Sequence, residues 1–331
     1  MSIRDNILED CRYSKIFSHP QLQKLQYVTL AGSHAYGTTT EDSDIDLRGW
    51  YHSSITDLLG VTNNKETQVE FADTDSVFFS FHKFIKLLTN CNPNIIELLG
   101  TQPEQVVYMS NDAKYLRDHA EMFLSKRAFV TFAGYATQQL RRLENALARD
   151  SYSPAEKEKH ILRSLEAEML AETDAFQLFH TDNAIKLYLA KANDADEIHI
   201  DLKLHAVPLR QFIALTHQFA NQLNNYDKLT GRNRKKDNAH LYKHAMHLIR
   251  LYYTGIDILK HHQIITYREK EHDLLMSIRN QEVSLAKVFQ LQQSLEIELQ
   301  HARDESTLPE YPDINTINQM VIQLIEQNNW R

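Results

Sequence analysis

The hydrophobic periodicity of the chain changes about a third of the way along its 331 residues, and this change limits the fold more than any other feature. Up to about residue 110, short runs rich in β-branched and aromatic residues predict strands at 26–31, 45–51, 68–72 and 77–81. Helical spacing returns at 82–89 and 94–99, where Pro93 suits a helix start. The first third should therefore form one sheet with helices around it.

From residue 112 onward the sequence consists mostly of long amphipathic stretches, which predict a helical bundle. They span residues 112–124, 126–149, 154–179, 208–226, 238–262, 268–279, 284–304 and 313–329, and a small hairpin or irregular excursion at 184–204 interrupts them. The polar residues 110–112 are the best boundary between the two patterns. We therefore predict an α+β protein, with a mixed sheet and flanking helices in residues 1–110 and an all-helical C-terminal domain in residues 111–331.

Composition narrows the classes of protein to which the chain can belong. Residues 1–17 contain no continuous apolar stretch and nothing later reaches membrane-spanning length, so we expect neither a signal peptide nor a membrane span. Cys11 and Cys91 lie far apart, which argues against a disulfide framework and favours the reducing cytoplasm. The formal net charge of -8 argues against a protein that coats nucleic acid indiscriminately.

Residues 226–250 have the opposite charge balance, with seven basic residues against two acidic ones and a local net charge of +5. Four of the cations form a cluster, Arg232, Arg234, Lys235 and Lys236, which is predicted to bind a polyanionic acceptor. Lys243, His247 and Arg250 share one side of the helix that follows, opposite an apolar stripe, and are predicted to contact nucleotide phosphates. Two alternatives stay open, an ordinary solvated basic face and a transition-metal site at His240, His244 and His247.

Residues 30–49 contain the pattern that most directly indicates chemistry. Gly32 and Ser33 follow a predicted strand, so a tight turn there can offer backbone N–H groups and a hydroxyl to a phosphate. Asp44 and Asp46 are predicted to lie in the next strand, where residues i and i+2 point to the same face. Two parallel carboxylates suit divalent cations in nucleotidyl transfer, and hard oxygen ligands favour Mg²⁺, or Mn²⁺ in its place. Solvated acids on an edge strand are the alternative.

The stretch GSHAYGTTTEDSDIDLRG (32–49) resembles the signature of the DNA polymerase β nucleotidyltransferase superfamily, in which a Gly-Ser pair precedes an Asp-x-Asp strand. More narrowly, the chain is similar to the predicted nucleotidyltransferases of RNA-repair operons, often called the RlaP family. Further similar segments lie at 75–88, 92–100, 243–255, 266–280 and 308–313. The resemblance implies a nucleotidyltransferase palm followed by a helical domain that completes the cleft for nucleotide and acceptor.

The resemblance also implies roles for individual residues. Asp44, Asp46 and Asp75 would be the catalytic metal ligands, while Glu70 and Asp73 remain rivals of Asp75 because one sequence does not fix strand register. Six residues would bind the nucleotide, namely Gly32, Ser33, Ser43, Lys243, His247 and Arg250.

The implied reaction is transfer of a nucleoside monophosphate from an NTP, with ATP favoured, to a hydroxyl acceptor, with an RNA 3′ end favoured. A protein side chain is a second acceptor class, which would make the protein an AMP-transferring regulator, and a small molecule such as an aminoglycoside is a third. A degenerate palm that only binds nucleotide or RNA is the non-enzymatic alternative, although the retained Asp44 and Asp46 weigh against it.

Overall fold

The computed structural model describes residues 10–41, 43–53, 67–151, 185–192, 195–203, 205–210 and 238–329, together with positions 7, 159, 162, 212, 213, 216, 217 and 220. The chain divides into two compact units. One unit comprises Met1–Leu140 and Tyr242–Arg331, and the other comprises Arg141–Leu241. Whether residues 1–110 form a domain by themselves stays a prediction.

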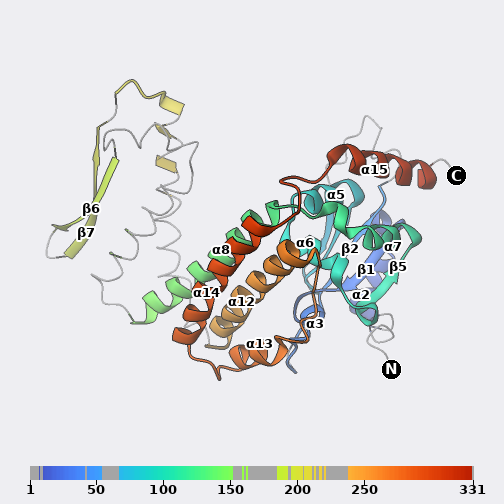
Figure 1. Ribbon diagram of the computed structural model, residues 1–331, viewed down its shortest axis with the longest axis horizontal. Coiled ribbons are helices and arrows are strands. Elements are labelled where there is room, and N and C mark those ends of the chain that lie inside the picture. Colours follow the sequence, from blue (N-terminus) through green and yellow to red (C-terminus); the bar gives the residue numbers. More distant parts are fainter. Residues whose placement is uncertain are drawn as a thin grey trace. The chain divides into compact units, whose positions relative to one another are not determined.

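The first unit is built on a five-stranded mixed sheet with the strand order β3-β4-β2-β1-β5 (Figure 1). The strands are β1 (Leu25–Leu30), β2 (Leu47–Tyr51), β3 (Gln68–Phe71), β4 (Ser76–Ser80) and β5 (Val106–Met109). Strands β2 and β4 are parallel, and the other neighbouring pairs are antiparallel. The four predicted strands are confirmed to within two residues at each end, whereas β5 was not predicted. The predicted α+β class is also confirmed.

Alternation along the strands gives the sheet two buried faces. One face packs against α2 (Cys11–Phe17), whose Tyr13 and Ile16 share a core with Val28, Leu47 and Phe78. Asp10 caps α2 by accepting a hydrogen bond from the Arg12 backbone N–H. The other face packs against α5 (Phe81–Thr89), where the Trp50 ring lies 4.9 Å from Phe81 and 5.8 Å from Phe84, measured between centroids.

Short helices connect the sheet to the longer ones. They are α3 (Gly32–Tyr36), α6 (Pro93–Ile96), α7 (Asn111–Asp118) and the 3-10 segments η1 (Pro20–Leu22), η2 (Glu97–Gly100), η3 (Pro103–Gln105) and η4 (Ala120–Phe123). Pro93 occupies the first turn of α6, as predicted. The Ser110 side chain caps α7 by accepting from the Ala113 N–H. The predicted helix at 112–124 is therefore two shorter segments.

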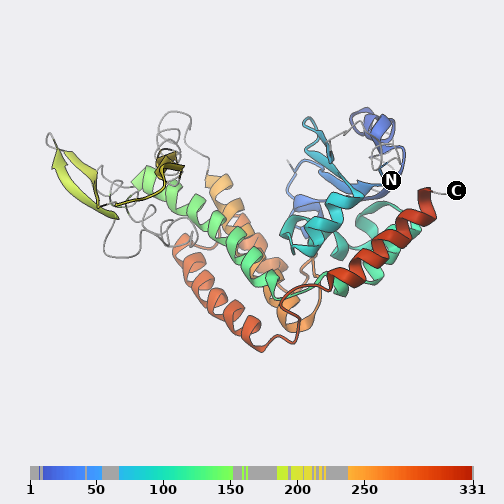
Figure 2. The ribbon, with the colours of Figure 1, turned by 90° about the horizontal axis from the view of Figure 1, so that it is seen from above.

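Three long helices run side by side in both views, α8 (Arg127–Ser151), α12 (Asn238–His261) and α14 (Leu285–Glu305) (Figures 1 and 2). Gly255 of α12 brings its backbone close to Phe132 of α8 and Leu299 of α14, since a Cβ there would lie 3.1 and 3.0 Å from them. The remaining helices are α13 (His272–Arg279) and α15 (Ile314–Asn329). None of the helices in the described ranges is long and apolar enough to cross a membrane.

The described part of the second unit contains an antiparallel hairpin formed by β6 (Ile185–Ala192) and β7 (Ala195–Leu202). The hairpin alternative predicted for 184–204 is therefore confirmed. The helices predicted at 154–179 and 208–226 lie almost wholly outside the described residues.

Candidate active site

The chain turns sharply after β1 and enters the short helix α3 at Gly32. Gly32 has a φ of 58°, a left-handed conformation that glycine adopts at little cost. A Cβ at this position would lie only 2.5 Å from the Asp46 Oδ2. The Ala31 N–H also donates to the Asp46 carbonyl oxygen at 2.9 Å. Glycine is thus required here both for the backbone conformation and for the close approach of the Asp46 carboxylate.

The segment that carries Asp44 and Asp46 lies just before β2 and not within it, so the prediction that both acids sit in a strand is wrong. In addition to the backbone bond from Ala31 to Asp46, two side chains fix this segment. The Tyr13 hydroxyl donates to the Ile45 carbonyl at 2.9 Å, and the Leu47 N–H donates to the Ser76 hydroxyl at 3.2 Å. The two acids therefore have different surroundings, because Asp44 is exposed and Asp46 is half-buried.

Asp75 lies in the turn between β3 and β4 and directly precedes β4. Since β2 and β4 are parallel, with Arg48 opposite Val77, their starting ends lie next to each other. Asp75 and Asp46 therefore flank the same end of neighbouring strands. The Asp75 Oδ1 accepts from the Arg48 Nη2 at 3.3 Å, and its carbonyl oxygen also accepts from Arg48. Asp75 has a φ of 42°, which aspartate tolerates better than most residues.

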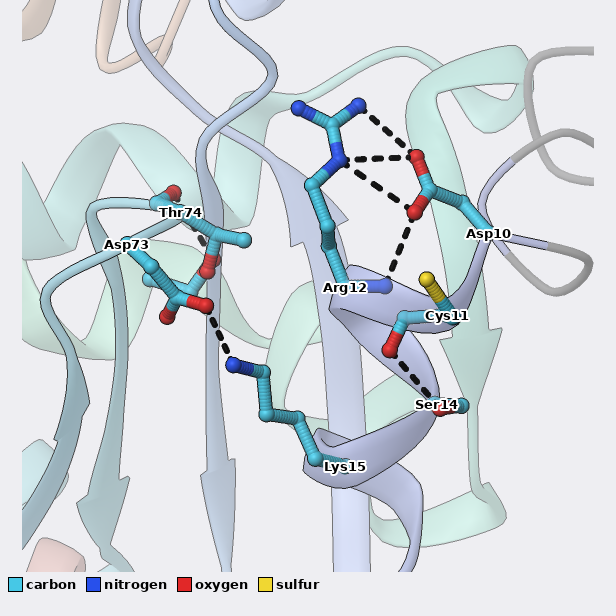
Figure 3. Close-up of polar contacts among 8 residues, drawn as sticks. Asp10, Cys11, Arg12, Ser14, Lys15, Asp73 and Thr74 are labelled. Carbon is cyan, nitrogen blue, oxygen red and sulfur yellow. Dashed lines mark hydrogen bonds and ion pairs between the residues drawn. The ribbon is translucent and has the colours of Figure 1, made fainter.

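The two rivals of Asp75 have other neighbours. Asp73 forms an ion pair with Lys15 of α2, which is visible in Figure 3 and lowers the pKa of Asp73 through the hydrogen bond. Glu70 is exposed on β3 and accepts from the Gln68 side chain. Asp75 is the acid whose charge acts most strongly on Asp46.

Asp46 sits at the electrostatic centre of this group. Burial, followed by the negative charges of Asp75 and Asp44, raises the pKa of Asp46 to about 6, although Arg48 and Lys243 act in the opposite direction. Three carboxylates therefore repel one another while two cations lie within electrostatic range. Such a group gains stability when a cation binds, because the repulsion is then relieved.

Helix α12 supplies Lys243, which is exposed, and His247, which is partly buried one turn later. Burial, followed by the charges of Arg250 and Lys243, lowers the pKa of His247 well below its usual value. His247 is therefore neutral at pH 7. Its ring meets the Tyr36 ring of α3 edge-on, with 6.2 Å between centroids.

The alternative of a solvated basic face is wrong for Arg250. Its side chain is 4% exposed and forms an ion pair with Glu97, whose side chain is 2% exposed. The guanidinium also lies 3.6 Å from the centroid of the Tyr36 ring, and the Tyr36 hydroxyl donates to the Glu97 Oε2 at 2.8 Å. A buried carboxylate requires a buried cation as its partner, so Arg250 neutralises Glu97 and holds α3 against α12.

A family model described as the RNA repair pathway DNA polymerase beta family, RlaP, matches residues 10–182, just over half of the chain. The chain belongs to this family. RlaP membership points to a DNA polymerase β-like nucleotidyltransferase, and the matched range includes Asp44, Asp46 and Asp75. The similar segments at 243–255, 266–280 and 308–313 lie beyond that range.

One curated relative of this RlaP chain is an uncharacterized 38.9 kDa protein from the nrdC-mobD intergenic region of Enterobacteria phage T4. It is 28% identical over 119 residues, which cover 33% of this chain and 35% of the relative. The chain thus spans about a third of the relative's length. No solved structure matches the chain significantly.

The family generally uses divalent metal ions, so the side chains of this site should include ligands suited to such ions. Within the described residues, no three His, Cys, Asp or Glu side chains already converge in a geometry that could hold an ion. His244, from the histidine triplet, instead has its Nδ1 2.9 Å from the Gln139 Oε1. The carboxylates of Asp44, Asp46 and Asp75 are nevertheless hard oxygen donors of the kind that Mg²⁺ and Mn²⁺ prefer. Their mutual repulsion at Asp46 makes them fit for a cation, provided that Asp75 leaves Arg48.

The structure also brings α13 to the loop that follows α3, an arrangement that the sequence did not predict. The Arg279 Nη2 donates to the hydroxyls of Thr40 and Ser43, each at 3.3 Å. The His272 Nε2 lies 2.9 Å from the Gly37 carbonyl oxygen. A Cβ on Gly37 would clash with the Tyr267 ring at 2.1 Å. The only signal in the sequence was the similarity of segment 266–280 to the family, since these contacts join residues more than 200 positions apart.

Ser33 and Ser43, both predicted to bind the nucleotide, lie on the two sides of this loop. Ser33 is in α3, and its carbonyl oxygen accepts from the Thr38 N–H at 2.9 Å. The Ser43 hydroxyl accepts from the Thr40 N–H at 2.8 Å. The predicted acceptor cluster of Arg232, Arg234, Lys235 and Lys236 lies outside the described residues.

Proposed function

We propose that this RlaP protein transfers a nucleoside monophosphate from an NTP, with ATP favoured, to a hydroxyl at the 3′ end of an RNA. The observation that carries the proposal is the position of Asp46, which lies against Gly32 and flanks the same end of neighbouring strands as Asp75. Burial, followed by the charges of Asp75 and Asp44, raises the pKa of Asp46 to about 6. Acids kept close together despite repulsion are typical of a site that binds cations together with phosphates.

The proposed step is a substitution at the α-phosphorus of the NTP. The acceptor oxygen forms a bond to this phosphorus, and the bond between the phosphorus and the α,β-bridging oxygen breaks. Pyrophosphate leaves with the electron pair, and the proton of the acceptor hydroxyl passes to water. The products are the nucleotidylated acceptor and pyrophosphate, so no oxidant or further reactant is required.

In this proposal, the three aspartates hold Mg²⁺ or Mn²⁺. When bound, such ions would favour ionisation of the acceptor hydroxyl and offset the charge on the departing pyrophosphate. Gly32, Ser33 and Ser43 contact phosphate oxygens, and the exposed Lys243 contributes a positive charge to the triphosphate. His247 contributes as a neutral hydrogen-bonding group because its pKa is low. Arg250 is left out of nucleotide binding since Glu97 already engages it.

The RNA acceptor rests on two supports. The family is described as an RNA repair pathway family, and four cations lie within residues 232–236. Single-stranded RNA binds to such clusters through its phosphates.

The test is to incubate the full chain with each α-³²P-labelled NTP, Mg²⁺ or Mn²⁺, and total RNA or cell lysate. We expect label on RNA and release of pyrophosphate, with none from Asp46→Asn, while Asp73→Asn serves as a matched control with the same chemical change. Label on protein or on a small molecule would replace the RNA acceptor with that class. Nucleotide binding without pyrophosphate release under either metal would overturn the transferase in favour of a binding module.

A further inference from the structure

Arg279 is a partly buried cation that forms no ion pair with an acid in the part of the chain that the structure describes. Three other buried or partly buried arginines of the first unit have an acidic partner, since Arg250 pairs with Glu97, Arg268 with Asp257 and Glu271, and Arg48 with Asp75, whereas Arg117 is bonded to neutral oxygens of Tyr27 and Thr101. No acidic side chain in the described ranges forms an ion pair with Arg279, whose Nη2 instead donates to two neutral hydroxyls. Its Nη1 is closed off from solvent and has no hydrogen-bond partner among the described residues.

This arrangement is costly for a guanidinium. A buried charged donor without a partner loses its hydration and gains nothing in return. Burial alone lowers the pKa of Arg279, and no neighbouring anion compensates. A ligand that brings negative charge and several acceptor oxygens to the guanidinium would offset the desolvation.

The position of Arg279 indicates what kind of ligand this is. Thr40 and Ser43, its two hydroxyl partners, lie between the Gly32–Ser33 turn and Asp44. Arg279 also belongs to the cations whose charge acts on His247, together with Lys243, and Lys243 in turn acts on Asp46. The guanidinium is thus within electrostatic range of His247, which lies one turn from Lys243 on α12.

Two further contacts fix α13 in this position. The His272 Nε2 meets the Gly37 carbonyl oxygen at 2.9 Å, and the Tyr267 ring lies against the Gly37 Cα, where no side chain would fit. Gly37 ends α3 in a left-handed conformation, with a φ of 70°. Arg279 is therefore presented by a helix that is anchored to the loop through several contacts and is not a freely moving surface cation.

We propose that Arg279 binds the β- and γ-phosphates of the NTP through its guanidinium. This inference rests on the proposed function, because it takes the triphosphate of that reaction as the ligand. Arg279 is then a specificity-determining residue that distinguishes triphosphates from monophosphates, and the Thr40 and Ser43 hydroxyls keep its guanidinium turned toward the site.

The experiment measures ligand binding, so its result does not depend on whether the protein catalyses nucleotidyl transfer. Isothermal calorimetry with Mg²⁺ would compare inorganic tripolyphosphate, α,β-methylene-ATP and AMP on the full chain, on Arg279→Met and on Arg279→Lys. We expect Arg279→Met to weaken tripolyphosphate and α,β-methylene-ATP by about tenfold or more, as charge-assisted hydrogen bonds do, with AMP unchanged. Arg279→Lys should lose less affinity because lysine keeps the positive charge, although it lacks the planar set of N–H donors of a guanidinium.

Arg303→Met is the matched control. Arg303 lies in the last turn of α14, as Arg279 does in α13, but its side chain is 41% exposed and forms an ion pair with Asp304. The Arg303→Met variant should bind all three probes with the same affinity as the wild type. Thermal unfolding without ligand provides the second readout, since a purely structural Arg279 would lower the melting temperature when replaced. We expect no lowering in Arg279→Met, because an uncompensated charge is removed.

Tripolyphosphate affinity in Arg279→Met equal to that of the wild type would overturn the inference, even if the enzyme is an active transferase. An Arg279→Met variant that loses affinity for a single-stranded RNA oligonucleotide but not for tripolyphosphate would also overturn it and would assign Arg279 to the acceptor. A wild type that binds tripolyphosphate through Arg279 yet releases no pyrophosphate would overturn the proposed function while supporting this inference.

Discussion

Lys243 and Arg250 are seven residues apart on α12 and looked equivalent in the sequence, yet their surroundings are opposite. Arg250 is buried, paired with Glu97 and stacked on Tyr36, whereas Lys243 is exposed and forms no ion pair with any described residue. A cation whose charge is already neutralised inside the protein supports the fold. A cation that acts on a group of acids without pairing with one of them is available to a ligand, and the same distinction separates Asp46 from Asp73, which pairs with Lys15.

The largest effect is expected at Asp46 and Asp44, because neither acid has an ion-pair partner among the described residues and both are therefore available to a ligand. We expect Asp46→Asn and Asp44→Asn each to lower nucleotidyl transfer by about 10³-fold or more, because each removes a charge that holds the metal while keeping the side-chain shape. Labelled-NTP transfer at saturating Mg²⁺ measures the effect. Turnover close to that of the wild type in either variant would contradict the metal assignment.

The stability of Asp46→Asn provides its control and should change in the other direction. The pKa of Asp46 in the folded protein, about 6, lies above the reference value of 3.8, so ionisation costs stability as pH rises through this interval. Asparagine carries no charge and avoids the cost. In EDTA at pH 7 we therefore expect Asp46→Asn to be more stable than the wild type, by about 1 kcal/mol once solvent screening of a half-exposed group is allowed for.

The second prediction sets two neighbouring acids against each other. Asp75→Asn should be nearly as damaging to transfer as Asp46→Asn, because Asp75 flanks the same strand end and acts most strongly on Asp46. Asp73→Asn removes the same charge two residues away, from a side chain that pairs with Lys15, and should change activity less than twofold. A sensitive Asp73 and a tolerant Asp75, in parallel assays, would reverse the assignment of the third carboxylate.

The third prediction separates the two cations of α12. Arg250→Met should lower the free energy of unfolding by about 3–5 kcal/mol, because it leaves the Glu97 carboxylate buried without a partner. Glu97→Gln should be damaging for the same reason, and the double variant should be less destabilised than the sum of the two single variants. Denaturant titration measures all three.

Lys243→Met is the matched substitution at the exposed cation of α12. We expect its unfolding free energy to stay within about 0.5 kcal/mol of the wild type and its KM for the NTP to rise about tenfold. A Lys243 variant that unfolds easily but keeps its KM would show that exposure does not mark the ligand-facing cation.

Most of the fold could be predicted from the sequence because it follows from local patterns. The strands 25–30, 47–51, 68–71 and 76–80 have β-branched and aromatic residues in short runs, and α12 and α14 have sustained helical spacing. The strand prediction failed where backbone groups form hydrogen bonds with side chains. Asp44 and Asp46 alternate with apolar residues as a strand would, but the Tyr13 hydroxyl and the Ser76 hydroxyl bond to the backbone there.

The candidate site was predictable only in part, for a different reason. Gly32, Asp44 and Asp46 lie within fifteen residues of one another, so a local signature was enough to indicate them. The burial of Arg250 depends on Glu97, which is 153 positions away, and the position of Arg279 depends on Ser43, which is 236 positions away. Helical periodicity places such residues on a face of a helix but does not say what that face packs against.

The smallest expected effect concerns the cluster of Arg232, Arg234, Lys235 and Lys236, which the comparison would class as ligand-facing if it binds RNA. Replacing all four with glutamine should weaken RNA binding and flatten its salt dependence, by about 0.7 in log-log slope for each phosphate of the single strand that the protein no longer neutralises. The KM for the NTP should not change, because this cluster is assigned to the acceptor. A matched control replaces four exposed cations elsewhere with glutamine, Lys86, Lys260, Lys270 and Lys287, so that the net charge changes equally. A flatter slope in the first variant alone would assign the effect to position rather than to net charge. An unchanged apparent affinity and slope in the first variant would remove the electrostatic support for an RNA acceptor, and a protein or small-molecule acceptor would then explain the site better.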